Sequence, residues 1–145
     1  MRKTVIPTRR IAFNVLFVAI LVFVVPHESN AQARRRLSSA DKAFQVFFTK
    51  FRAAVARRNK SSVAALTLFP FKYGFDTGDE GTFSKAQFVA RFNDMFGGQS
   101  VFRQSNPLFY TSSGRFELVN EDDASHFVFR KVGGIYKFVS YMSEP

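Results

Sequence analysis

The chain has 145 residues, a length that fits one domain, and it contains 20 phenylalanines but no cysteine or tryptophan. The absence of cysteine excludes disulfides, thiolate catalysis and zinc–thiolate sites, so packing alone must hold the core. Lysine and arginine number 21 against 11 acidic residues, which gives a formal net charge of +10. The composition therefore predicts a phenylalanine-rich core and an affinity for anionic partners.

Residues 1–33 have the pattern of a secretory signal peptide. A basic start is followed by residues 11–25, which are apolar except for Asn14, and then by the small-x-small site Ala31-Gln32-Ala33. The alternative of a membrane anchor is weaker, because this run is shorter than the roughly 20 residues that span a bilayer. We predict cleavage after Ala33 and export to the periplasm or the extracellular space. The mature chain would then have a basic, flexible N-terminus over 34–39 and a single domain over 40–145.

The positive charge is concentrated near the start of this mature chain. Residues 34–60 hold nine basic side chains and one acidic one, a net of +8, whereas residues 61–145 have a net of −1. Such a segment could contact anionic lipid, envelope polysaccharide or nucleic acid, and export argues against nucleic acid. The ordinary alternative is a solvated helix face with a flexible tail. The predicted basic patch consists of Arg34, Arg35, Arg36, Lys50, Arg52, Arg57, Arg58 and Lys60.

Three segments have the period of helices. Residues 40–59 repeat phenylalanines at three- and four-residue steps, which places them on one stripe. Residues 61–66 read as a second, short helix that ends before Pro70. Residues 84–96 read as a third helix, because Ser84 and Gln87 form a capping box and a second phenylalanine stripe follows.

The remaining segments have the period of strands. An alternating stretch over 71–75 precedes the turn-rich residues 76–81, and further strands are predicted over 101–103, 108–111 and 115–120. Two longer strands, 124–131 and 135–141, flank a Gly-Gly hairpin turn. This order predicts an α+β fold in which the N-terminal helices pack on a curved antiparallel sheet and form a cone.

Three stretches carry a family resemblance: FTKFRAAVARRNKSSVAALTLFPF over 48–71, TFSKAQFVARFNDMF over 82–96 and VFRKVGGIYKFVSY over 128–141. In element order and aromatic positions the chain resembles the nuclear-transport-factor-2-like superfamily. This is a cystatin-like α+β cone that also houses ketosteroid isomerases and many small secreted domains. The resemblance implies a pocket between the helices and the concave sheet, with dimerisation through the outer sheet face common. It carries no catalytic signature, since this fold hosts unrelated activities.

Aromatic residues with few nearby acids favour a binding function over catalysis. The first interpretation is an exported, non-enzymatic domain that binds a small apolar ligand or a protein partner through a Phe-lined cone. It needs no cofactor and no metal. The predicted pocket-lining residues are Phe44, Phe48, Phe51, Phe88, Phe92, Phe96, Tyr110, Phe127 and Phe129.

Two other interpretations remain open. The chain could be a pocket enzyme of the isomerase or hydrolase type that uses His126, Tyr73 or Asp76, which requires two of them to converge on one cavity. The ordinary explanations, which the lack of visible partners favours, are a half-buried histidine, a packed tyrosine and an aspartate that starts a turn. Alternatively, the basic first helix could dock the domain on anionic surfaces, and such binding would weaken with salt.

Overall fold

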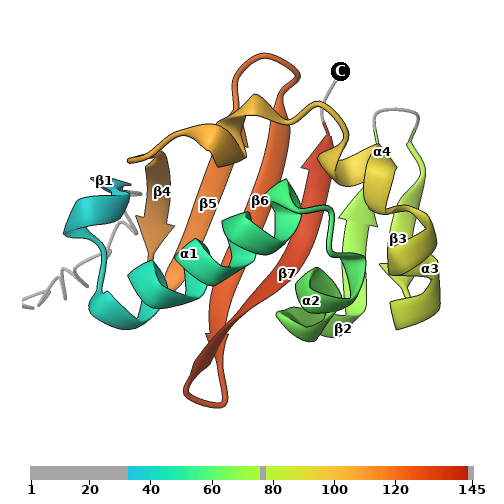
Figure 1. The fold of residues 1–145 in the computed structure, drawn as a ribbon, viewed down its shortest axis with the longest axis horizontal. Coiled ribbons are helices and arrows are strands. Elements are labelled where there is room, and N and C mark those ends of the chain that lie inside the picture. The colour runs from blue at the N-terminus through green and yellow to red at the C-terminus, as the bar shows by residue number, and fades with distance from the viewer. Residues whose placement is uncertain (1–32, 76–77, 144–145) are drawn as a thin grey trace, which may run out of the picture.

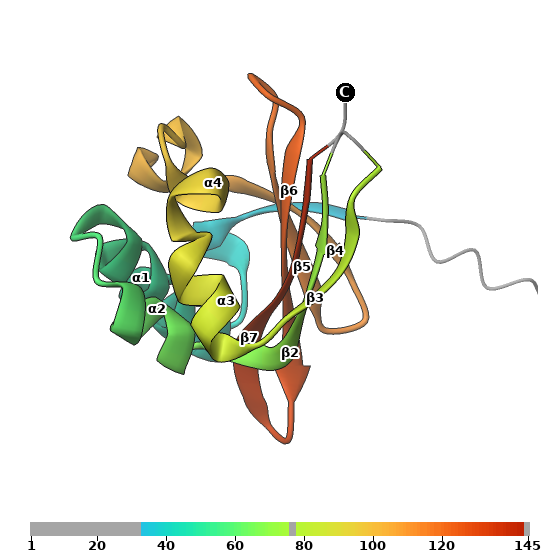
Figure 2. The same cartoon turned by 90° about the vertical axis from the view of Figure 1, so that its right-hand side faces the viewer.

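The computed structural model describes residues 33–75 and 78–143, and it places all the α-helices on one face of a seven-stranded sheet (Figures 1 and 2). The strand order is β1-β4-β5-β6-β7-β2-β3, and all neighbours are antiparallel except β2 and β7, which run parallel. The predicted α+β class is therefore confirmed. Except for Ala33, the predicted signal peptide lies outside the described residues. None of the described helices has the length and apolar character needed to cross a bilayer.

The seven strands are connected mainly by short turns, and two 3₁₀ helices, η1 and η2, flank the helical layer. The strands are β1 (Ala33–Arg36), β2 (Thr67–Gly74), β3 (Glu80–Phe83), β4 (Leu108–Ser112), β5 (Arg115–Asn120), β6 (Ser125–Val132) and β7 (Ile135–Ser143), and the 3₁₀ helices are η1 (Leu37–Ser39) and η2 (Ser100–Arg103).

The first two helices correspond to the two predicted near the start of the domain. Helix α1 (Lys42–Ala56) begins after Asp41, whose carboxylate accepts the backbone N–H of Phe44 at 2.8 Å. Helix α2 (Lys60–Ala65) begins after Asn59, which accepts the N–H of Ser62 at 3.0 Å. Helix α1 thus ends three residues earlier than predicted, because the residues up to Asn59 form the turn and cap of α2.

The third predicted helix is divided into α3 (Lys85–Ala90) and α4 (Phe92–Phe96). Its capping box is confirmed: Ser84 Oγ accepts the N–H of Gln87, and Gln87 Oε1 accepts the N–H of Ser84. The division falls at Arg91, whose ψ of 8° departs from helical geometry.

Residues 34–39, predicted as a basic, flexible N-terminus, lie in β1 and η1, where the backbone of β1 pairs with β4 and Leu37 is buried. One sequence prediction is wrong in this part of the fold. Residues 101–103 belong to η2 instead of a strand. The neighbours Val101 and Phe102 are both buried, and a strand would point them to opposite faces.

The core is a layer of phenylalanine rings between α1, α3, α4 and the sheet. Phe51 of α1 shows the pattern: it is fully buried, and its ring centroid lies 5.2 Å from that of Phe129 on β6 and 5.1 Å from that of Phe138 on β7. Such tilted and edge-to-face pairs are the favoured aromatic geometries. The fully buried phenylalanines are Phe44, Phe48, Phe51, Phe71, Phe88, Phe92, Phe109, Phe127, Phe129 and Phe138.

Candidate functional site

The aromatic interior predicted for a ligand pocket is occupied by its own rings. Phe48 and Phe129 have centroids 5.6 Å apart, Phe51 and Phe96 6.0 Å, and Phe96 and Phe127 5.9 Å. Close packing of this kind leaves no room for a ligand without displacing side chains. The eight predicted phenylalanines are therefore core residues in this structure: Phe44, Phe48, Phe51, Phe88, Phe92, Phe96, Phe127 and Phe129 are each at most 7% exposed.

The ninth residue predicted to line the pocket, Tyr110, lies on the opposite face of the sheet. Successive residues of a strand point to opposite faces, and on β4 the fully buried Phe109 points inward. The Tyr110 ring instead packs 4.5 Å from the guanidinium carbon of Arg34, which also donates a hydrogen bond to the Tyr110 hydroxyl. Tyr110 is therefore part of the outer surface.

A network of polar side chains closes the end of the interior near the β5–β6 loop. Asn120 Nδ2 donates to Gln99 Oε1 at 2.8 Å, and Gln99 Nε2 donates to Asp123 Oδ2 at 2.6 Å. The hydroxyls of Ser125 and Tyr141 lie 3.2 Å apart. Because these polar groups satisfy one another where they are buried, the network fixes η2 on β5 and β6.

At the other end of the aromatic core, the structure has a hollow of ≈ 370 Å³, which we call the mouth. It lies between β1, the β4–β5 turn, the start of α1 and the start of β7. Phe116 and Tyr136 contribute aromatic surface, and Arg35 and Asp41 contribute charge, while the guanidinium of Arg115 is paired with Glu117. The complete lining is Ala33, Arg35, Asp41, Thr111, Ser112, Ser113, Gly114, Arg115, Phe116 and Tyr136.

The rings of the mouth are an extension of the core. Phe116 stacks on Phe44 with centroids 3.7 Å apart, and Tyr136 meets the Phe44 ring edge-to-face at 5.1 Å. Phe116 and Tyr136 are each 6% exposed, so their bodies are packed. The mouth therefore has a rigid aromatic floor.

A short hydrogen bond joins the two ends of the domain at the mouth. Tyr136 Oη donates to Asp41 Oδ2 at 2.5 Å, while Asp41 Oδ1 caps α1. Burial alone would raise the pKa of Asp41, but the hydrogen bonds from Tyr136 and from the Phe44 N–H, with the charge of Lys131, outweigh it and lower this pKa. Burial and the Asp41 carboxylate raise the pKa of Tyr136. The pair is therefore a carboxylate and a neutral phenol at ordinary pH.

The candidates for catalysis are not brought together. His126 Nδ1 lies 2.7 Å from Oε1 of Glu117 on the outer face of the sheet, and Glu117 Oε2 lies 2.8 Å from the Arg115 guanidinium. Tyr73 lies near the β2–β3 edge, where it stacks on Phe83 at 3.8 Å. Asp76 lies outside the described residues. Tyr73 and His126 thus have separate surroundings.

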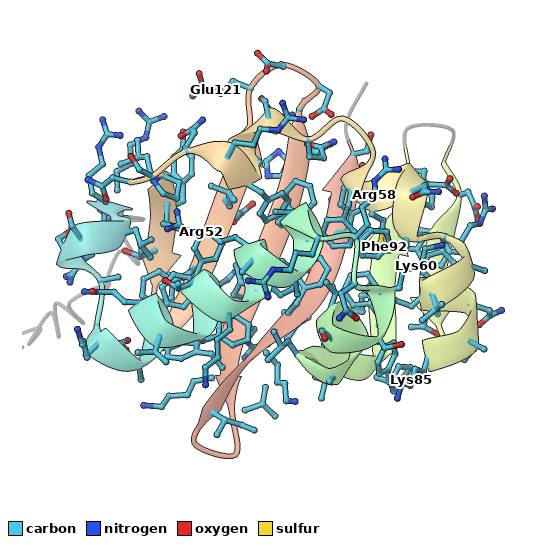
Figure 3. All side chains as sticks on the ribbon, viewed as in Figure 1. Arg52, Arg58, Lys60, Lys85, Phe92 and Glu121 are labelled. Carbon is cyan, nitrogen blue, oxygen red and sulfur yellow. The ribbon has the colours of Figure 1, made fainter. Side chains whose placement is uncertain are left out.

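The predicted basic patch is divided among several places. Arg36 donates to the Asn106 carbonyl at 3.2 Å, and Arg52 donates to the Gln104 and Ser105 carbonyls at 2.9 and 3.2 Å. Arg58 and Lys60 lie at the far end of α1 and the start of α2, where the Lys60 ammonium is 5.9 Å from the Phe92 ring (Figure 3). The remaining helix cations, Lys50 and Arg57, line a shallow hollow of ≈ 390 Å³ between α1 and α2.

Metal-ligating side chains do not cluster within the part of the chain that the structure describes: no three of His, Asp and Glu gather there as a metal site would need. Sequence reasoning missed the mouth, whose residues come from four separate segments. Asp41 caps α1, and its partner Tyr136 lies 95 residues away. Residues 34–36 are all arginines, so no alternation in the sequence signals the position of Arg35; only its pairing with Phe109 on β4 places it on the inner side.

The chain is similar to solved structures of nuclear-transport-factor-2-like proteins, the superfamily that its sequence resembles. One from Cytophaga hutchinsonii, of unknown function, is 10% identical with a TM-score of 0.49, covering 72% of this chain and 91% of that one. Another of unknown function from Pseudomonas putida is 11% identical with a TM-score of 0.44, covering 74% and 87%. A cystatin-like protein of unknown function from Nostoc punctiforme is 12% identical with a TM-score of 0.43, covering 70% and 87%.

At these identities the likeness concerns the fold alone. No protein-family model and no curated protein matches the sequence.

Proposed function

We propose that the protein is a non-enzymatic binding domain that holds a small organic anion at the mouth of its aromatic core. The observation that carries this proposal is the combination of an aromatic floor with the Arg35 side chain at a hollow of ≈ 370 Å³. Phe116 and Tyr136 offer apolar contact, and Arg35 offers positive charge. The ligand would touch the end of the core, because the interior is filled.

The charges at the mouth select the ligand class. Asp41 is the one acid in its lining, and both of its carboxylate oxygens are already bonded to the protein. Guanidinium groups bind carboxylates through charge-assisted hydrogen bonds. Arg35 pairs across the strands with Phe109, and it is in none of the ion pairs among the described residues. Hydroxyl groups of the β4–β5 turn add further donors. A planar carboxylate, with an aromatic or apolar body, matches this arrangement.

The test compares benzoate with benzamide, its neutral analogue of the same shape, by amide chemical-shift mapping of the full domain. Benzoate should shift the amides of residues 34–36 and 111–116 in a saturable manner, and benzamide should do so much more weakly. Arg35→Gln should reduce the benzoate effect, while Arg103→Gln, an exposed control on η2, should not. Equal effects of the two compounds, or shifts elsewhere on the domain, would contradict the proposal.

A second candidate function is docking on an anionic surface, and the outward stripe of α1 favours it. Val46 is 47% exposed and lies on the outward side of α1, one helical turn from Lys42 and one from Lys50. Arg57 lies on the same side at the end of the helix. An exposed apolar residue between cations is typical of helices that lie on anionic membranes. Sedimentation with phosphatidylglycerol vesicles should decrease steeply between low and high salt. Salt-insensitive sedimentation would exclude this function.

We also infer that the domain is exported, on the strength of the pattern over residues 1–33. Expression of the full chain in a bacterial host and fractionation of the cells should place it outside the cytoplasm. Sequencing of its N-terminus should begin at Arg34. A cytoplasmic chain that retains residues 1–33 would contradict export.

A further inference from the structure

We propose that a groove on the uncovered face of the sheet binds an extended acidic segment of a partner protein, and this goes beyond the ligand proposed for the mouth. The helices all lie on the other face (Figure 2). The groove has a volume of ≈ 270 Å³ and crosses β2, β7 and β6. Its lining is Leu68, Pro70, Lys72, Arg115, Val128, Arg130, Val132, Val139 and Ser140.

The floor of the groove is apolar although no element covers it. Val128 is only 4% exposed and Val139 is half-buried. Leu68 and Val132, one from each side of the groove, are each 37% exposed. A line of exposed aliphatic side chains across a sheet face is a feature of interaction surfaces.

The rim of the groove is entirely basic. Lys72 and Arg130 are exposed and Arg115 is half-buried, and no acid belongs to the lining. Two acids lie beside the groove on this face: Glu117 is paired with Arg115 and with His126, and Glu80 on β3 faces Gly74, two residues along β2 from Lys72. Among the described residues Lys72 and Arg130 take part in none of the ion pairs, so they remain available to an acidic partner.

These charges argue against a second copy of the chain as the occupant. A two-fold interface centred on the groove would place the same cations from both copies on one apolar strip, whose lining contains no acid. Such like-charge contacts disfavour association. The same basic rim would attract an acidic partner.

The register of the strands gives the spacing that the partner needs. Lys72 pairs with Ser140, which pairs with Val128, and Arg130 lies two residues further along β6. The backbone positions of Lys72 and Arg130 are two strand spacings apart across the sheet and two residues apart along the strands. Together these offsets separate them by about 12 Å. Same-face residues four apart in an extended chain are separated by about 13 Å. The matching segment is therefore acid-x-apolar-x-acid, with the apolar residue on Val128 and Val139.

The probe is a labelled peptide with Glu-Ser-Val-Ser-Glu at its centre, and the control peptide carries Gln in place of both Glu residues. Fluorescence anisotropy with the full domain should show tighter binding of the acidic peptide. The double variant Lys72→Gln/Arg130→Gln should weaken it about fivefold, in line with two exposed charge contacts. Lys85→Gln, an exposed control on α3 at the opposite face, should bind like the parent (Figure 3).

Four results would overturn the proposal: equal binding of the two peptides, unchanged binding by the double variant, a dimer of the parent domain in analytical ultracentrifugation that the acidic peptide does not dissociate, or displacement of the peptide by phosphatidylglycerol vesicles. The last result would mean that the groove binds anionic lipid. An unchanged unfolding midpoint confirms that the variant folds. Benzoate binding at the mouth should be the same in the double variant, so failure at one site is distinguishable from failure at the other.

Discussion

The two faces of the central sheet are built from the same strands and have opposite chemistry. On β6 the inward Phe127 and Phe129 are fully buried among rings, while the outward His126 and Arg130 meet other polar groups or solvent. This difference shows that the side chains of the inner face stabilise the fold by packing. A ligand or partner would therefore bind at the rim of the aromatic core or on the outer face.

The largest expected effect is on the inner face. Phe51→Ala should destabilise the domain by about 3–5 kcal/mol, because it removes a fully buried ring that contacts Phe129 and Phe138. Urea unfolding followed by circular dichroism measures the change. Val46→Ala on the exposed side of the same helix serves as the control and should cost about 0.5 kcal/mol or less. A loss below about 1 kcal/mol for Phe51→Ala would mean that the rings are loosely packed.

The next effect tests whether the outer face also contributes to stability. Glu117→Ala should cost about 2 kcal/mol, since it leaves Arg115 and His126 without their carboxylate partner. Glu121→Ala in the exposed β5–β6 loop is the matched control, with an expected change near zero (Figure 3). If both variants unfold at the same urea concentration, the outer charges play no part in holding the sheet.

The mouth lies between the two faces of the sheet, and the stability that Asp41 contributes there should depend on pH. Asp41→Asn keeps a helix cap but loses the charge that accepts from Tyr136, so it should cost about 1 kcal/mol at pH 7. The folded domain lowers the pKa of Asp41 from its ordinary 3.8. Its contribution is therefore complete above that value and is lost as pH falls through the lower, folded pKa. The two proteins should converge in stability at low pH, and a constant difference down to acid would contradict this assignment.

The smallest effect separates structural cations from solvated ones. Arg52→Gln should cost about 0.5–1 kcal/mol, because Arg52 donates to two carbonyls before β4. Arg57→Gln, an exposed cation at the end of the same helix, should change stability by less than about 0.5 kcal/mol. Thermal unfolding of the two variants side by side makes the comparison. The reverse order would show that the carbonyl contacts are dispensable.

Much of the helical layer could be predicted, because its signals are local. The Phe44-to-Phe51 stripe and the Ser84–Gln87 capping box lie within a few residues of one another, and a helix repeats its pattern regardless of distant partners. The α+β class followed from the order of these segments. Whether this phenylalanine stripe packs a core or lines a pocket could not be predicted, because periodicity shows a buried face without showing whether a cavity adjoins it.

The features that could not be predicted depend on contacts between residues that are remote in the sequence. Arg34 and its two neighbours have no alternating apolar pattern, and they form a strand only because β4 offers an unpaired edge. Phe109 and Tyr110 are adjacent aromatics, so their sequence could not say which points inward. The mouth depends on the meeting of Asp41 with Tyr136, which only the folded sheet brings about.

The parallel pairing of β2 with β7 has a consequence for the order of folding. β2 follows the first two helices, yet its parallel neighbour is β7, the last of the described strands, and the Phe138 N–H of β7 donates to the Leu66 carbonyl at 3.0 Å. Phe138 also supplies ring contacts to Phe71 and Phe88. During synthesis, the core around β2 can therefore close only after β7 has been made. The pairing of these two strands brings together segments far apart in the sequence, a kind of contact that slows folding.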